Sequence, residues 1–111
     1  MIEILLKNYL EKTLKIRVSM ELAEITDKNH VVIQKTGSSV KNHIKKSTFA
    51  IQSYGESLYE AAKLNEEVKA AMENFITEQE ISKIELDTDY YFPSIETKQY
   101  RYQAVFEITY Y

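Results

Sequence analysis

Few polar side chains of this 111-residue sequence are spaced for chemistry. Asp87 and Asp89 are two positions apart, so on a strand both carboxylates would share one face, where they could act as an acid–base pair or hold a hard cation. Lys83 and Glu85 continue the same alternation, which is typical of a solvated strand face. We therefore interpret this acidic run as protein surface rather than as a catalytic pair.

Other catalytic and metal-binding patterns are missing from the sequence. His30 and His43 are far apart and no cysteine accompanies them, so we expect no metal site and place both histidines on the surface. Without cysteine, the chain forms neither disulfides nor thiol nucleophiles. The two glycines, Gly37 and Gly55, do not make a phosphate-binding loop. We expect neither a cofactor nor an enzymatic activity.

Nine tyrosines in a strand-rich chain raise the question of nucleic-acid binding, because aromatic rings on a sheet can stack on bases. Most of these tyrosines lie in the acidic C-terminal half, and the isoelectric point near 5.4 opposes binding to phosphate. The tyrosines are therefore interpreted as core or interface residues.

A strand, a glycine and a helix between Ser47 and Phe75 organise the rest of the chain. The strand is predicted from Thr48 to Tyr54, and the helix from near Ser57 to near Ile76. Ser57 and the glutamate three residues later fit a capping box at the start of the helix. The alanines of this helix predict close packing against a sheet or a second helix rather than a cofactor role.

The N-terminal third predicts one helix and one strand. Helical spacing of apolar residues indicates a helix from the first residues to about Lys12. Alternation between Leu14 and Met20 then indicates a half-buried strand. Residues 21–29 form a connection in which 23–25 either extend a strand or turn.

Three further strands are predicted. The first runs from His30 to Thr36 and ends at a turn over 37–39. The basic stretch 40–46 after it is either a mobile loop or a projecting hairpin arm. The last two strands cover 83–92 and 100–111, and the final one is expected inside the sheet.

This order predicts a single α+β domain over residues 1–111. It has two layers: a mainly antiparallel sheet of four to five strands, and two helices packed on one face of that sheet. No apolar run reaches the roughly 20 residues of a membrane-spanning helix, and the N-terminus lacks the pattern of a signal peptide. We therefore expect a protein made in the cytoplasm.

The charge is unevenly distributed along the chain. Residues 1–55 carry nine Lys or Arg and five acids, and residues 56–111 carry five and twelve, so the halves have charges of +4 and −7, which sum to −3. Opposite charges on two surfaces favour head-to-tail association, although the imbalance is equally compatible with an ordinary solvated surface. The candidate contact between subunits joins a basic loop to an acidic strand: Lys41, Lys45 and Lys46 with Glu85, Asp87 and Asp89.

Several stretches together resemble one protein family. A short N-terminal helix, the segment Phe49-Ala-Ile-Gln-Ser-Tyr-Gly-Glu-Ser57, the alanine-rich Glu60–Leu64 and the closing strand opened by Tyr100-Arg-Tyr102 are similar to the tail terminator, or tail completion, proteins of long-tailed bacteriophages and prophages. The resemblance covers nearly the whole chain. This sequence lacks the proline that often follows the first strand in members of that family.

The resemblance implies a structural virion protein of the phage tail, present in the host cytoplasm during assembly. Its expected partners are further copies of itself in a six-subunit ring, the tail tube protein, and the head-tail connector protein. Phage DNA would pass through the ring without specific binding. Tyr110 and Tyr111 are candidates for the contact with the tube.

Two alternatives remain open. Within phage particles, a neck or head-completion protein or another minor tail protein has the same kind of small α+β domain. Outside them, a small cytoplasmic domain that binds a peptide or ligand fits the same composition.

Overall fold

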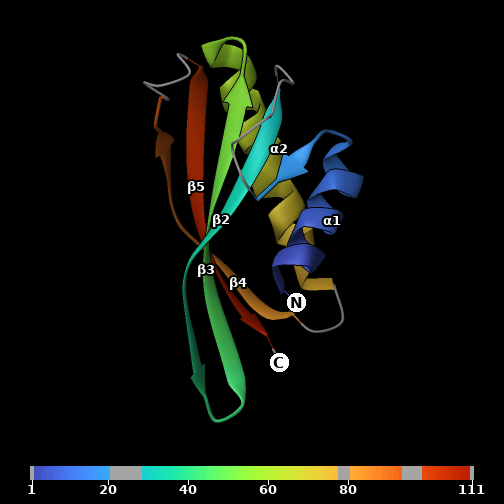
Figure 1. Ribbon diagram of the computed structural model, residues 1–111, viewed down its shortest axis with the longest axis vertical. Helices are drawn as coiled ribbons and strands as arrows, with labels where there is room; N and C mark the ends of the chain where they lie inside the picture. The colour runs from blue at the N-terminus through green and yellow to red at the C-terminus, as the bar shows by residue number, and fades with distance from the viewer. Residues whose placement is uncertain (1, 21–28, 78–80, 94–98, 111) are drawn as a thin grey trace.

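The computed structural model describes residues 2–20, 29–77, 81–93 and 99–110 (Figure 1). A five-stranded sheet of order β1-β2-β3-β5-β4 forms one layer, and two helices cover one of its faces. The pairing is antiparallel except between β1 and β2. The α+β prediction is therefore confirmed. The elements are α1 (Ile2–Leu14), β1 (Val18–Ser19), β2 (His30–Lys41), β3 (Ile44–Gly55), α2 (Leu58–Asn74), the 3-10 turn η1 (Phe75–Thr77), β4 (Ile81–Tyr91) and β5 (Tyr100–Tyr110).

The unit formed by β3 and α2 is the centre of the fold. The Ser57 side chain accepts a hydrogen bond of 3.1 Å from the backbone N–H of Glu60, so the predicted cap is present. At Gly55 the backbone of α2 comes so close that an added Cβ would lie 2.5 Å from the Ala61 nitrogen. The packing predicted for the helix alanines holds for Ala61 and Ala71, which are buried, whereas Ala70 is exposed.

The N-terminal helix runs two residues further than predicted, and most of the strand predicted over 14–20 is wrong. Leu14 completes a helical spacing with Leu10, so it closes α1 instead of opening a strand. Lys15 then turns the chain with a φ of 58°. Only Val18 and Ser19 are strand, and the buried Val18 pairs in parallel with Val31.

The turn predicted at 37–39 is also wrong. Strand β2 continues through Gly37 to Lys41. Its register with β3 shifts at a bulge between Lys35 and Gly37. The chain reverses at Asn42 and His43, which have φ values of 53° and 67°. Of the two readings of residues 40–46, the projecting hairpin arm is the correct one.

The remaining strands match the sequence analysis closely. Strand β5 lies between β3 and β4, so its predicted position inside the sheet is confirmed. The β2–β3 hairpin extends beyond the helices, and the molecule measures 43 × 24 × 24 Å (Figure 1). Within the described part of the chain, neither helix combines the length and the apolar character needed to span a membrane.

Candidate interaction surface

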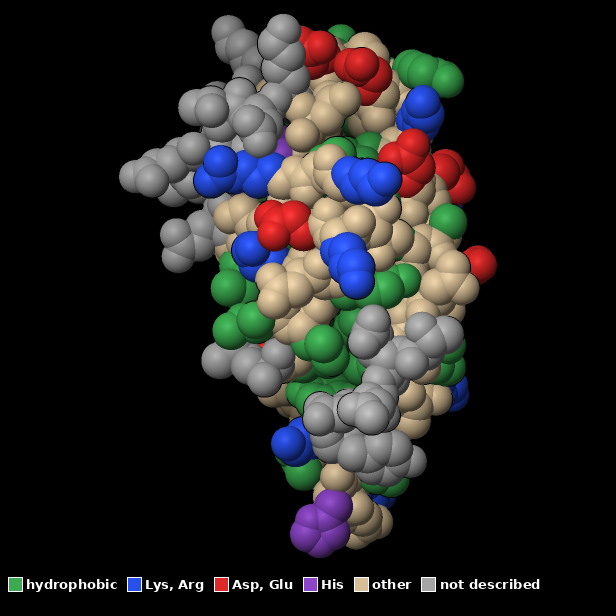
Figure 2. Space-filling view, turned by 90° about the vertical axis from the view of Figure 1, so that its right-hand side faces the viewer, with side chains coloured by type: hydrophobic (Ala, Val, Ile, Leu, Met, Phe, Trp, Pro, Cys, Tyr) green, Lys and Arg blue, Asp and Glu red, His purple; other side chains and the backbone are tan. Residues whose placement is uncertain are grey.

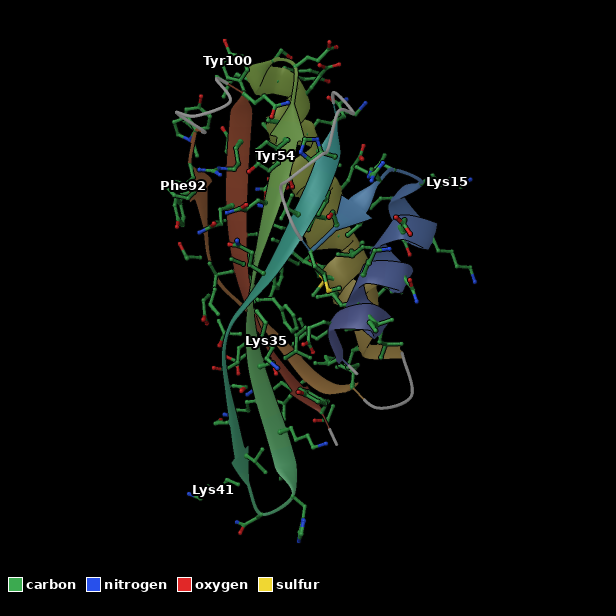
Figure 3. The ribbon with its side chains drawn as sticks, in the orientation of Figure 1. Lys15, Lys35, Lys41, Tyr54, Phe92 and Tyr100 are labelled. Atoms are coloured by element: carbon green, nitrogen blue, oxygen red, sulfur yellow. The ribbon has the colours of Figure 1, made fainter. Side chains whose placement is uncertain are left out.

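The end of the β2–β3 hairpin, residues 36–47, is the most exposed regular structure in the molecule, and we call it the arm. Every residue from Gln34 to Lys46 is exposed, and Ser47 is the first buried residue on the return strand. Two of the exposed side chains are apolar: Val40 at 68% and Ile44 at 41% of full exposure. Lys41 lies at the far end, pointing away from the body (Figure 3). The arm therefore presents both charge and apolar surface.

The hairpin is basic because residues 29–55 contain four lysines and no carboxylate. Lys35, at the base of the arm, is 3.7 Å from the carboxylate of Glu3 in α1, and Lys46 is 3.6 Å from that of Glu107 in β5. Lys41 and Lys45 have no carboxylate partner among the described residues. Figure 2 shows the tapered end of the molecule, while acidic side chains gather toward the opposite end of the same view. Of the three predicted contact lysines, two are thus uncompensated and one is partly neutralised within its own subunit.

The acidic residues predicted on one face of β4 are divided between two faces. The register shifts between Leu86 and Thr88, so Asp87 is an extra residue and the alternation changes at that point. Glu85 lies opposite Glu107 on the face without helices. Asp89 lies opposite Ala104 and reaches α2, where its carboxylate is 3.3 Å from Lys69. The prediction of a continuous acidic face is therefore wrong, because sequence alternation cannot reveal a bulge.

Lys83 and Glu85 neutralise each other on the face without helices, at 2.8 Å. Their hydrogen bond is the main cause that raises the pKa of Lys83 and lowers the pKa of Glu85. Both side chains are highly exposed, so we assign this pair no stabilising energy.

Lys69 connects α2 with the edge strand β4. Its ammonium group is 2.8 Å from Glu66 and 3.3 Å from Asp89. The hydrogen bond that Lys69 donates to the Glu66 carboxylate is the main cause that raises the pKa of Lys69, opposed by some desolvation and aided by Asp89. The lysine is therefore charged at neutral pH and forms a bridge between the two elements.

A groove of about 570 Å³ runs between α2 and β4, and we call it the α2–β4 groove. Its apolar floor includes the partly buried Ile84, the exposed Leu86 and the buried Phe106. Its charged rim consists of Glu66, Lys69 and Glu73, all from α2. The groove combines apolar contact area with a net negative rim.

The two histidines occupy different environments. His43 lies exposed in the turn of the arm, as predicted. His30 is fully buried, which contradicts its predicted surface position. Its ring stacks on Tyr54, with centroids 4.4 Å apart and planes inclined by 13°, so it forms part of the aromatic packing of β2 and β3.

A polar network on the sheet face without helices escaped the sequence analysis. Arg101 donates to the Tyr54 hydroxyl at 2.9 Å and to the Phe92 carbonyl at 2.6 Å, and its guanidinium lies 4.3 Å from the centroid of the Phe92 ring. Gln52 donates to Gln103 at 2.9 Å. Alternation of polar residues in the two neighbouring strands was the available signal, but their pairing was needed to interpret it.

Arg101 makes a further hydrogen bond within the same network. Besides Tyr54 and Phe92, Arg101 donates to the Pro93 carbonyl at 3.4 Å. Figure 3 shows Tyr54 and Phe92 at the same end of the sheet. The network therefore fastens the end of β4 to β3 and β5 and has the character of a structural cluster.

Tyr110 is integrated into the sheet. It pairs with Lys45 and Ile81, and its hydroxyl is 2.8 Å from that of Ser47. Sheet packing accounts for these contacts, and a contact with a tail tube stays a prediction. Tyr111 lies outside the described residues.

In residues 2–20, 29–77, 81–93 and 99–110, no three His, Asp or Glu side chains are close enough together to hold a metal ion. The sequence matches no protein-family model and no curated protein.

Proposed function

We propose that this chain is a structural subunit that closes the tail tube of a long-tailed phage as a six-subunit ring. The ring ends tube polymerisation and presents a surface to the head-tail connector. The sequence resemblance is one support for this proposal. The other is the projecting basic arm, which is the structural feature best suited to contact a neighbouring subunit.

The exposed surface of the arm is energetically unfavourable in an isolated molecule, and this supports a role in assembly. Exposed Val40 and Ile44 gain nothing in water, and Lys41 and Lys45 have no carboxylate partner among the described residues. Both features become favourable when an acidic, partly apolar surface covers them. When the arm of each copy contacts the acidic residues of the next copy, the contact is head to tail and can close into a ring.

A second candidate is a peptide-binding domain, and the α2–β4 groove is the observation that favours it. A groove with an apolar floor and a charged rim can accept a short segment with apolar and basic residues. This candidate requires a stable monomer that binds such a peptide with one-to-one stoichiometry. The ring proposal requires self-association.

The test replaces the arm lysines and measures self-association by sedimentation velocity over a range of protein concentrations. The variant K41Q/K45Q/K46Q removes three positive charges from the arm. We expect it to remain monomeric at concentrations where the wild-type protein associates, because the charge attraction between subunits is lost.

The matched control is K12Q/K15Q/K63Q, which removes three positive charges from exposed positions outside the arm. Its net charge equals that of the arm variant, so general electrostatic effects are the same. We expect it to associate as the wild type does. Equal association of both variants and the wild type would show that the arm has no part in assembly.

A further inference from the structure

We infer that the arm of one copy docks into the α2–β4 groove of a second copy, with the arm lysines facing Glu66 and Glu73. This inference rests on the proposed assembly role and adds to it the two surfaces that meet. It follows from complementary charge, complementary apolar residues and matching length.

The charges of the two surfaces are opposite. Lys41 and Lys45 have no carboxylate partner among the described residues. The groove rim carries Glu66 and Glu73, with Asp89 beside them, against the single positive charge of Lys69. The rim thus has an excess of negative charge after its internal ion pairs are formed.

The apolar residues of the two surfaces also match. Register places Val40 opposite Lys45 and Ile44 opposite Lys41, so one broad face of the arm carries Val40 with Lys45, and the other carries Ile44 with Lys41 and Lys46. The groove has two walls: α2 supplies the glutamates, and β4 supplies Ile84 and the exposed Leu86. An inserted arm can therefore contact both walls.

The dimensions agree as well. From the pair Gly37–Thr48, at the base of the arm, to the pair Lys41–Ile44, at its end, the hairpin spans about 14 Å at ~3.4 Å per residue. The α2 residues that line the groove, from Glu66 to Glu73, span about 10 Å at ~1.5 Å per residue. The arm is long enough to fill the groove along its length.

The groove is favoured over the free edge of β4 as the docking place. Strand β4 is the last strand of the described sheet, so its outer edge has no neighbour there. Register shifts after Ile81 and Leu86 distort that edge, and the exposed Lys83 lies on the same strand. Bulges and charges of this kind oppose the addition of another strand, so side chains in the groove carry the contact.

The contact is expected to be weak for a single pair of subunits. One hairpin arm covers less than the roughly 1,200–2,000 Å² of a stable interface. Ring closure strengthens the assembly, since each subunit then uses its arm and its groove at once. The experiment must therefore detect a transient contact.

Site-directed cross-linking meets this need because the natural chain has no cysteine. The variants Val40→Cys in the arm and Leu86→Cys in the groove are mixed and treated with a short bismaleimide, so that every heterodimer reports a contact between two molecules. The control replaces Leu86→Cys by Tyr59→Cys, at the start of α2. Tyr59 is more exposed than Leu86, at 73% against 44%, so random collisions favour the control.

We expect several-fold more heterodimer from the arm–groove pair than from the arm–control pair, with the difference falling as salt is added. Equal yields, or a higher yield from the control pair, would overturn the inference. Circular dichroism of each variant verifies the fold before cross-linking.

A charge exchange provides the second measurement. In K41E/K45E, the acidic arm of one copy repels the acidic groove of the next copy. In E66K/E73K, the basic groove of one copy repels the basic arm of the next. Each variant alone is therefore expected to be monomeric. Mixed together, they are expected to associate with alternating subunits, because acidic arm meets basic groove and basic arm meets acidic groove. Failure of the mixture to associate would contradict the inference.

The two proposals fail in different ways. Closed rings without the arm–groove cross-link would overturn this inference and leave the proposed ring function in place. Cross-linked open chains would support the inference and contradict a tube-closing ring.

Discussion

At the scale of single residues, Ser57 is the clearest case of a role that can be deduced from sequence. A serine followed by glutamate three residues later predicts a cap, and the hydrogen bond from the Glu60 N–H is present. Ser57→Ala should reduce the free energy of unfolding by about 1 kcal/mol, because one N–H at the helix start loses its acceptor. Urea unfolding followed by circular dichroism measures this change.

The control for the cap is Ser39→Ala, an exposed serine on the arm. Its effect should stay within about 0.5 kcal/mol, as for most surface substitutions. If both serine variants lose the same stability, the cap is not the cause.

Lys69 leads to a prediction about alkaline pH. Its folded-state pKa is raised above 10.5, chiefly by the hydrogen bond that Lys69 donates to Glu66. A raised lysine pKa stabilises the folded state below the unfolded pKa, and this contribution disappears as the pH rises through the folded pKa. Stability should therefore fall more steeply above about pH 10.5 in the wild type than in Lys69→Met.

The comparison with Lys69→Met is needed because alkaline pH acts on the whole chain and not on this lysine alone. The two proteins differ only at residue 69, so the difference between their unfolding curves isolates the lysine. Parallel curves over the whole alkaline range would contradict the assigned role of Lys69.

The roles of residues that depend on pairing between strands could not be predicted from the sequence. The burial of His30 follows from its stacking on Tyr54, which becomes its neighbour only once β2 and β3 pair. Arg101 likewise meets Phe92 and Tyr54 across two strand pairs. Periodicity assigns such residues to a face but does not identify their partners.

At the scale of elements, Gly55 limits how the central strand and helix can pack. Gly55→Ala should lower the free energy of unfolding by about 1–3 kcal/mol, because the new Cβ meets backbone atoms of α2 that cannot move independently. Thermal or urea unfolding measures the loss.

Gly37→Ala is the matched control in the other glycine of the chain. An added Cβ at Gly37 meets nothing within 4 Å, so its effect should be within about 0.5 kcal/mol. Equal losses in the two variants would show that contact with α2 is not responsible.

The elements themselves were largely predictable, and their errors have local causes. Both helices and three of the four long strands, β3, β4 and β5, follow from spacing. The turn predicted at Gly37 failed because a bulge lets a strand pass through a glycine. The strand predicted from Leu14 failed because Leu14 satisfies helical and strand spacing at once, and packing of α1 decided between them.

The acidic strand shows how an element-scale error changes a proposed site. Alternation placed Glu85, Asp87 and Asp89 on one face, whereas the bulge sends Asp89 toward α2. The α2–β4 groove then becomes the better acidic surface, and it could not be recognised before the helix and strand were placed together.

At the scale of the whole molecule, the account predicts association that depends on salt. Attraction between an exposed basic arm and an acidic groove is screened as ionic strength rises, since the Debye length falls from about 10 Å at 0.1 M to about 3 Å at 1 M. Sedimentation velocity of the wild type should show the associated fraction decreasing over that range. An associated fraction that increases with salt would indicate a mainly apolar interface instead.

The most direct test of the central claim is the oligomeric state of the protein itself, recorded by native mass spectrometry over a concentration series, with negative-stain images of the most concentrated sample. The account predicts head-to-tail assembly that closes into six-subunit rings as concentration rises. A stable two-fold dimer at all concentrations would contradict it, because two subunits that exchange their arms reciprocally leave no arm or groove free to continue into a ring.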